Sequence, residues 1–226
     1  MMRYFRVKNS RNRKIVGFPY QTNGYISGYD VKSPNSRTNL NYDEFPDFVP
    51  DLRFELHEKS KLTDVVDASN ISAIGFLVNE KLKCIFDEFN FPTHRYYNAS
   101  ILDHKGNVLP YYWMHIISND YSLVDFEKSV FRKSSFPLKV TATKSDEKIW
   151  VEDIEDLRTQ KINLFKEDKY IVADILEMNN FPKYDVLHFR DICGFVYISE
   201  VLVNKINENK ITGFDIVEDF DFKVSL

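Results

Sequence analysis

Residues 76–82 read Phe-Leu-Val-Asn-Glu-Lys-Leu, and residues 196–202, which begin 120 positions later, read Val-Tyr-Ile-Ser-Glu-Val-Leu. Each stretch has three apolar residues, then a side chain suited to the N-terminus of a helix, then Glu and, two positions on, Leu. Asn79 and Ser199 can accept hydrogen bonds from the unpaired N–H groups of a first helical turn. The glutamate that follows each of them lies where the helix dipole favours a negative charge. The two stretches therefore predict two similar units, each a short strand that enters a helix and is followed by another strand.

The register between the two copies continues, because Glu88 aligns with Glu208 and Phe91 with Ile211. In the first copy the apolar residues follow the i, i+3, i+4, i+7 spacing of one helix face, at Leu82, Ile85, Phe86 and Phe89. The chain between the copies is rich in strand signals, such as the aromatic stretch 109–117 after a turn at residues 103–107. We predict an α+β fold of mixed or antiparallel sheets with a few helices, including the two similar strand–helix–strand units.

Residues 1–60 differ in character from the rest of the chain. They contain many turn signals and one stretch, residues 52–56, that alternates like a half-buried strand. We expect an N-terminal strand and loop region at 1–60 and an α+β domain at 61–226, with one continuous domain over 1–226 as the alternative. Residues 3–14 are basic; we interpret them as an edge strand protected by charge rather than as a phosphate-binding segment, and expect no nucleic acid partner.

The bulk composition is that of a globular protein. Of 226 residues, 43% are hydrophobic and 28% are charged, with a net charge of −4. Cys84 and Cys193 both lie in apolar settings, which predicts buried free thiols in a reducing compartment. No apolar segment follows the basic N-terminus, and no stretch reaches the roughly 18 apolar residues that span a bilayer. We expect a cytoplasmic protein without a membrane partner.

The sequence lacks the patterns that usually carry catalysis. The seven glycines are scattered, so no phosphate-binding loop is formed, and no nucleophile motif is present. If residues 185–191 form one strand, His188 points away from Asp185 and Asp191, which argues against a metal site. We expect no catalytic residue, no metal and no cofactor. The alternative is a hydrolase that uses an acid pair, with Asp120 and Asp125 or Glu152 and Asp156 as the candidates.

Two acidic stretches, residues 146–156 and 215–221, stand out against this background. Such stretches can be solvated surface, or they can attract a basic partner by electrostatic steering. We predict that these stretches form a complementary face for a basic protein partner. The predicted partner-binding residues are Glu152, Asp153, Glu155, Asp156, Glu218, Asp219 and Asp221.

Four passages resemble a family of bacterial immunity proteins encoded beside polymorphic toxins, the eleventh class of that immunity series. The first is the helix entry at 76–82 with Glu88-Phe89-Asn90-Phe91-Pro92 after it, and the second is Tyr111-Tyr112 with Asp125 to Phe131. The third is Phe189-Arg190, and the fourth is the ending Tyr197-Ile198-Ser199-Glu200 with Ile211-Thr212-Gly213-Phe214. The resemblance spans about residues 71–131 and 185–220, a little under half of the chain. Related proteins share this ending and carry two CxxCG pairs, which this chain lacks, so the resemblance implies no zinc.

The resemblance implies an immunity protein that neutralises a cognate toxin, encoded by the adjacent gene, through protein–protein contact. Such a protein acts by its surface, with a few buried anchors inside a polar rim. Asp125 and Ser129 are expected to anchor a turn or a helix end rather than to touch the toxin, and Glu80 and Glu200 are expected to be structural.

Overall fold

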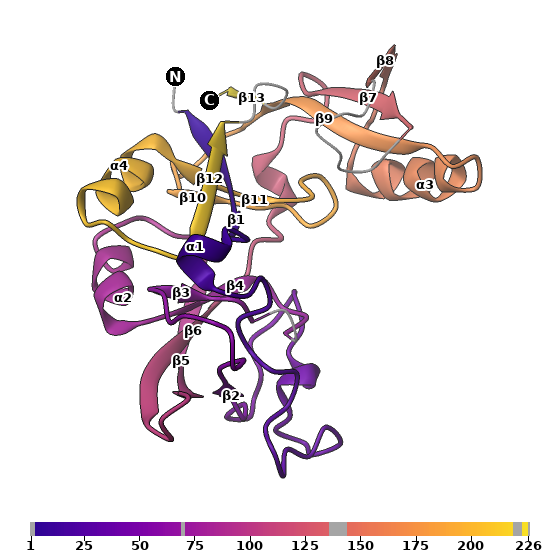
Figure 1. Ribbon diagram of the computed structural model, residues 1–226. Coiled ribbons are helices and arrows are strands. Elements are labelled where there is room, and N and C mark those ends of the chain that lie inside the picture. Colours follow the sequence, from indigo (N-terminus) through magenta and orange to yellow (C-terminus); the bar gives the residue numbers. More distant parts are fainter. Residues whose placement is uncertain (1–2, 69–70, 136–143, 219–222, 226) are drawn as a thin grey trace. The chain divides into compact units, whose positions relative to one another are not determined.

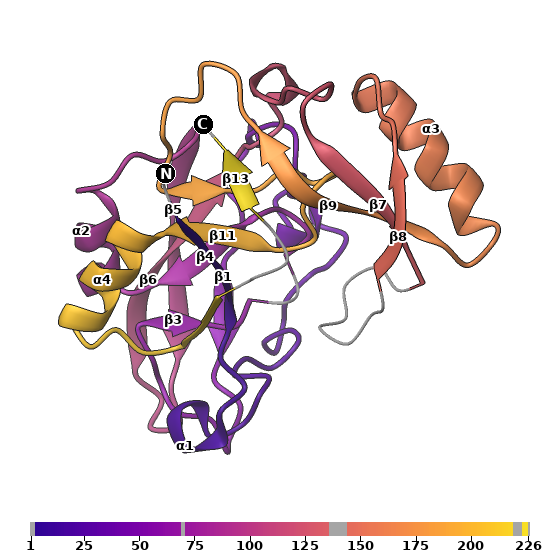
Figure 2. The same cartoon turned by 90° about the horizontal axis from the view of Figure 1, so that it is seen from above.

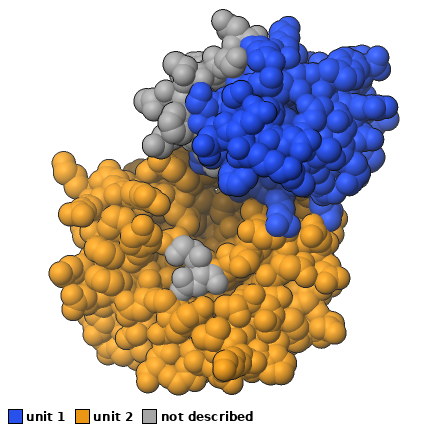
Figure 3. Space-filling model, turned by 90° about the vertical axis from the view of Figure 1, so that its right-hand side faces the viewer, with its two compact units in different colours: residues 1–6, 119–200, 217–226 blue, residues 7–118, 201–216 orange. Residues whose placement is uncertain are grey.

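The computed structural model of the chain describes residues 3–68, 71–135, 144–218 and 223–225. These residues form an α+β fold of short helices and mixed or antiparallel sheets, so the predicted fold class is confirmed (Figure 1). The chain divides into two compact units (Figure 3): unit 1 comprises residues 1–6, 119–200 and 217–226, and unit 2 comprises residues 7–118 and 201–216. Each unit combines segments that are distant in the sequence. The domain boundary expected between residues 60 and 61 lies inside unit 2.

Unit 2 is built on a five-stranded sheet with the strand order β2-β5-β6-β4-β3. The strands are β2 (Arg53–Glu55), β3 (Val65–Val66), β4 (Gly75–Val78), β5 (His94–Leu102) and β6 (Val108–Ile116). β5 and β6 form a long antiparallel hairpin (Figure 1). Its turn lies at residues 103–107, where the sequence predicts one. The Asp103 carboxylate stabilises this turn by accepting hydrogen bonds from the N–H groups of Lys105 and Asn107, each at 2.8 Å. The strand predicted at 52–56 is confirmed as β2, which pairs parallel to β5.

The two faces of this sheet pack against different parts of unit 2. On one face Leu77, Ile101 and Trp113 join an apolar core with residues from the segment 40–73. On the other face lies α2 (Glu80–Phe86), whose buried residues are Leu82, Ile85 and Phe86. The remaining short helices of unit 2 outside the repeated elements are α1 (Arg13–Val16) and the 3₁₀ turn η1 (Arg37–Asn39). The apolar spacing in the first copy of the repeat therefore predicts the buried face of α2 correctly.

Unit 1 contains a four-stranded sheet with the strand order β13-β9-β7-β8. The strands are β7 (Val130–Ser134), β8 (Lys144–Ile149), β9 (Tyr170–Glu177) and β13 (Lys223–Ser225). β13 runs parallel to β9, and the other pairs are antiparallel. Between β8 and β9 the chain forms α3 (Ile154–Phe165), which lies along this sheet (Figure 2). α3 is anchored by Leu157, which is buried in the core of unit 1 with Phe131 and Leu176.

A third sheet has the strand order β10-β11-β1-β12. Its strands are β1 (Tyr4–Asn9), β10 (Val186–Leu187), β11 (Val196–Ser199) and β12 (Phe214–Glu218). β1 therefore lies between two strands, and the prediction that the basic N-terminal run is an edge strand is wrong. The reason is that β11 pairs with one edge of β1 and β12, from near the C-terminus, pairs with the other edge. The boundary between the two units falls inside β1 and inside β12.

The two predicted strand–helix–strand units are confirmed. The first is β4 and α2 followed by β5, and the second is β11 and α4 (Glu200–Glu208) followed by β12. Each first strand pairs antiparallel with a two-residue strand: β3 pairs with β4 through Val66↔Leu77, and β10 pairs with β11 through Leu187↔Tyr197. The two copies therefore share a β–β–α arrangement that extends further upstream than the sequence repeat shows.

Two local expectations are corrected. Cys193 is buried as expected, but Cys84 is exposed, because it lies on the side of α2 opposite the buried face. Residues 185–191 do not form one strand, since β10 covers only Val186 and Leu187. The alternation that placed His188 opposite Asp185 and Asp191 therefore does not apply there, and His188 is a buried residue that follows β10.

Candidate functional site

Four of the seven predicted partner-binding residues lie together at the start of α3 in unit 1. Asp153 is the N-cap of the helix, Glu155 and Asp156 belong to its first turn, and Glu152 immediately precedes the cap. Glu218 ends β12 and forms an ion pair with Arg3. Asp219 and Asp221 lie outside the described residues.

The carboxylates at the start of α3 explain why the helix begins there. The side chain of Asp153 accepts a hydrogen bond from the N–H of Asp156 at 2.8 Å. Asp156 in turn accepts from the backbone N–H of Glu152 at 2.9 Å and from the side-chain amide of Gln160 at 2.8 Å. The negative charges also lie at the positive end of the helix dipole. Helix capping therefore holds Asp153 and Asp156 in defined positions.

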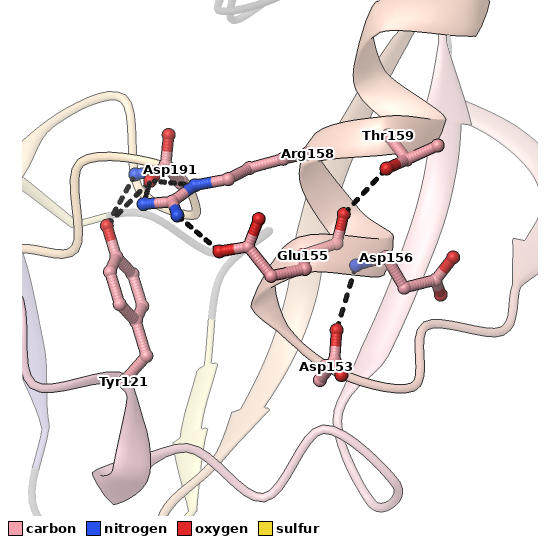
Figure 4. A network of polar contacts seen from close by, with 7 residues as sticks. All are labelled: Tyr121, Asp153, Glu155, Asp156, Arg158, Thr159 and Asp191. Atoms are coloured by element: carbon pink, nitrogen blue, oxygen red, sulfur yellow. Dashed lines mark hydrogen bonds and ion pairs between the residues drawn. The ribbon is translucent and has the colours of Figure 1, made fainter.

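A polar network joins α3 to the loop after β10 and to the 3₁₀ turn η2 (Tyr121–Leu123) (Figure 4). Arg158 donates to Glu155 at 2.6 Å and to Asp191 Oδ2 at 2.7 Å from Nη2 and 3.1 Å from Nε. The hydroxyl of Tyr121 donates to the same Asp191 oxygen at 2.8 Å. Lys161, one helical turn beyond Leu157, donates to the backbone carbonyl of Asp191. α3 is thus held by a charged network as well as by its one buried leucine.

The pKa shifts in this network follow from burial and pairing. Burial raises the pKa of Asp191, but the hydrogen bonds from Arg158 and Tyr121 and the positive charge of Arg158 outweigh it, so the pKa lies below its usual value. Burial and the hydrogen bond to Asp191 raise the pKa of Tyr121 to about 12. Burial lowers the pKa of Lys161. Asp191 is therefore ionised and Tyr121 is a neutral hydrogen-bond donor at neutral pH.

Three carboxylates at the start of α3 have no ion-pair partner among the described residues. Glu155 is neutralised by Arg158, whereas no ion pair joins Glu152, Asp153 or Asp156 to a lysine or arginine among the residues that the structure describes. Hydrogen bonds from backbone and amide donors orient Asp153 and Asp156 without cancelling their charge. The start of α3 is consequently an ordered acidic surface.

Large apolar side chains on α3 and in the segment just before it are exposed to solvent. Trp150 is 65% exposed, Ile162 62% and Phe165 63%. Ile162 and Phe165 are three residues apart on α3 and therefore share a helix face. The side chain of Gln160 donates to the backbone carbonyl of Trp150 at 2.9 Å, which connects the backbone at Trp150 to the helix. We call Trp150, Glu152, Asp153, Asp156, Ile162 and Phe165 the α3 surface.

The acid pairs considered for a hydrolase have local structural roles. Asp120 accepts from the backbone N–H of Ser122 at 3.2 Å and begins η2, and Asp125 forms an ion pair with Lys128 at 2.7 Å. The Ser129 hydroxyl donates a hydrogen bond to the Asp125 carbonyl at 2.6 Å. The expectation that Asp125 and Ser129 anchor a turn is therefore confirmed. Glu152 and Asp156 interact through the Glu152 backbone. In the described residues no group of three or more His, Cys, Asp or Glu side chains is placed to hold a metal ion.

Comparisons with known proteins add no family assignment. The chain matches none of the models of known protein families. A search of curated proteins gives no significant match. In the part of the chain that the structure describes, no helix has the length and apolar character needed to cross a membrane.

Sequence reasoning found the acids of the α3 surface but missed the apolar residues and the Arg158 network. The spacing of Glu155 and Arg158 was a usable signal for an ion pair on a helix. Asp191 could not be found in this way, because it lies 33 residues from Arg158. The spacing of Ile162 and Phe165 would have predicted burial rather than exposure, since apolar residues at helical spacing usually mark a buried face.

Proposed function

We propose that this chain is an immunity protein that binds a cognate toxin, encoded by the adjacent gene, through the α3 surface and does no chemistry of its own. The observation that carries the proposal is that α3 and the segment just before it carry both carboxylates without an ion pair to a described residue and the exposed side chains of Trp150, Ile162 and Phe165. Ile162 and Phe165 share one helix face, and large apolar side chains that are exposed together mark protein interaction sites. The resemblance of four sequence passages to the immunity family names the partner as a toxin.

The chemistry of the α3 surface indicates a partner with a basic, partly apolar face. Aromatic side chains supply the anchors of most protein interfaces, and Phe165 and Trp150 are suited to that role. The carboxylates of Glu152, Asp153 and Asp156 would attract lysine or arginine and raise the association rate at low salt. Because capping bonds already orient Asp153 and Asp156, little side-chain entropy is lost when a partner binds.

The test is binding between this chain and the product of the adjacent gene, measured by calorimetry and by rescue of cell growth when both are produced. Phe165→Ala is expected to weaken binding by about 2 kcal/mol, or roughly 30-fold, as for an interface anchor. Ile162→Ala is expected to act in the same direction with a smaller effect. Glu152→Lys is expected to slow association, and the difference from wild type should shrink at high salt.

Two matched variants serve as controls. Val108→Ser removes an equally exposed apolar side chain at the start of β6, and Glu208→Lys reverses an exposed charge at the end of α4. Neither is expected to change affinity. If the adjacent gene product is not toxic, or if it does not bind wild-type protein, the immunity proposal fails. If it binds but Phe165→Ala and Glu152→Lys behave like the controls, the α3 surface is not the contact site.

A further inference from the structure

Three buried polar groups lie close together on the face of the five-stranded sheet that packs against the segment 40–73. Tyr97 of β5 and Trp113 of β6 are direct cross-strand partners, and His115 lies two residues after Trp113, so all three share one face. Trp113 is 3% exposed and His115 is fully buried. Within the described residues, Trp113 Nε1, His115 Nδ1 and the Tyr97 hydroxyl have no hydrogen-bond partner, although all three atoms are buried.

The hydrogen-bonding role of His115 Nδ1 follows from the other ring nitrogen. His115 Nε2 lies 2.9 Å from the backbone carbonyl oxygen of Asn41. A carbonyl oxygen only accepts hydrogen bonds, so Nε2 carries the proton. Burial lowers the pKa of His115, and the nearby charge of Arg95 lowers it further, so the ring is neutral at neutral pH. Nδ1 is therefore an acceptor, whereas Trp113 Nε1 is a donor.

The neighbouring contacts show where these atoms meet. Gly75 is the cross-strand partner of His115, and a Cβ atom at Gly75 would lie 2.7 Å from Cζ2 of Trp113, on the edge of the indole that carries Nε1. The ring of Tyr97 is 6.4 Å from that of His115, and Phe45 covers His115 edge-on at 5.3 Å. The rings of Tyr97 and Phe45 thus contact His115, and the edge of Trp113 that carries Nε1 faces the strand position opposite His115.

We propose that an internal water molecule is bound here, accepting the hydrogen of Trp113 Nε1, donating to His115 Nδ1 and completing a third bond with the Tyr97 hydroxyl. Buried polar groups without a partner are destabilising, and buried waters typically make about three hydrogen bonds to such groups. Water is the smallest molecule that both donates and accepts. A cation is disfavoured by the positive charge of Arg95, whose guanidinium lies 4.7 Å from the ring of Phe45.

The two tryptophans of the chain provide a direct test. In ¹⁵N-labelled wild-type protein, the indole proton of Trp113 is expected to show a cross-relaxation peak to water of the sign that marks a molecule bound for longer than protein tumbling. The indole proton of exposed Trp150 is the internal control and is expected to show only bulk-water exchange; Trp150→Phe assigns the two signals. Absence of the bound-water peak at Trp113 overturns the proposal.

Stability measurements test whether Tyr97 belongs to the same site. If its hydroxyl bonds the water, Tyr97→Phe lowers the thermal midpoint, because the water loses a partner. If the hydroxyl is buried without any partner, the same change raises the midpoint, because an unsatisfied polar group is removed, and the three-way site is wrong. Tyr111→Phe on the neighbouring strand β6 is the matched control: its hydroxyl donates to the Thr63 carbonyl at 2.7 Å, so its loss is expected to lower the midpoint.

Discussion

Asp64 binds Asn79 twice: its carbonyl accepts the backbone N–H of Asn79 at 3.0 Å, and its carboxylate accepts the side-chain amide at 2.9 Å. Asn79 in turn caps α2 by accepting the N–H of Leu82 at 3.0 Å. The second oxygen of Asp64 accepts both the N–H and the hydroxyl of Thr212, each at 2.8 Å. One carboxylate therefore joins the start of α2 to the turn before β12.

The second copy of the repeat contains the equivalent pair. The carbonyl of Asp185 accepts the N–H of Ser199 at 2.9 Å, and its carboxylate accepts the Ser199 hydroxyl at 2.5 Å. Asp64 immediately precedes β3, and Asp185 immediately precedes β10. Asn79, Ser199 and Thr212, which belong to the passages quoted for the family resemblance, thus have structural roles.

Replacing Asp64 is expected to destabilise unit 2. Asp64→Ala removes the acceptor for Asn79 and Thr212, and we expect a loss of about 2–3 kcal/mol, as for partly buried hydrogen bonds to a charged group. Fluorotryptophan labelling gives one ¹⁹F signal for each unit, from Trp113 in unit 2 and Trp150 in unit 1. In a urea titration the Trp113 signal should shift to lower urea. Glu58→Ala, at a side chain that is 78% exposed, is expected to leave both signals unchanged, and an equally small effect of Asp64→Ala would contradict the assigned role.

Gly213 is expected to tolerate no side chain. Its φ of 103° is in the region that favours glycine, and a Cβ atom would lie 2.1 Å from the carbonyl oxygen of Val65. Gly213→Ala combines this clash with backbone strain, so we expect a loss of more than about 3 kcal/mol. Gly28→Ala separates the two effects, because Gly28 also has a positive φ, of 76°, but nothing lies within 4 Å of its Cβ position. That control should cost about 1 kcal/mol in the same unfolding measurement.

Stability is expected to fall as the pH drops below about 6.5, the usual pKa of histidine. Burial, together with the charge of Arg190, lowers the pKa of His188 to about 4. Unfolded chains therefore bind a proton at this site before the folded protein does, so its contribution is complete above pH 6.5 and is lost between 6.5 and 4. The shift corresponds to roughly 3 kcal/mol. His188→Leu should flatten the pH dependence of unfolding in this window, and an unchanged slope would show that His188 is not buried as a neutral ring.

Breaking the Arg158–Asp191 contact is expected to loosen α3 by a moderate amount. Both side chains are partly exposed, at 43% and 26%, so solvent screening limits the effect and we expect Arg158→Ala to cost about 1 kcal/mol. Arg158→Lys should recover part of this, since it keeps the charge but not the two-nitrogen contact. Lys169→Ala breaks the exposed pair with Glu167, whose atoms lie 2.9 Å apart, and should change stability by no more than about 0.5 kcal/mol. Equal effects of Arg158→Ala and Lys169→Ala on the Trp150 signal would argue against a role for Asp191 in holding α3.

The sequence by itself determined the local elements. Asn79 and Glu80 predict the start of α2, the apolar spacing from Leu82 predicts its buried face, and Asp103 predicts the β5–β6 turn. These signals depend on hydrogen bonds and contacts within about four residues, which a sequence pattern records directly. The same reasoning identified the carboxylates at the start of α3.

Only the tertiary structure decided which distant residues meet. β1 is an internal strand because β12 pairs with it. Asp64 accepts hydrogen bonds from Thr212, which lies 148 residues later in the chain. Arg158 binds Asp191, which lies in the loop after β10. Ile162 and Phe165 have the spacing of a buried helix face and are nevertheless exposed. Their exposure depends on which side of α3 packs on the sheet through Leu157, and that choice is made by the shape and charge of the surrounding chain, which no local pattern contains.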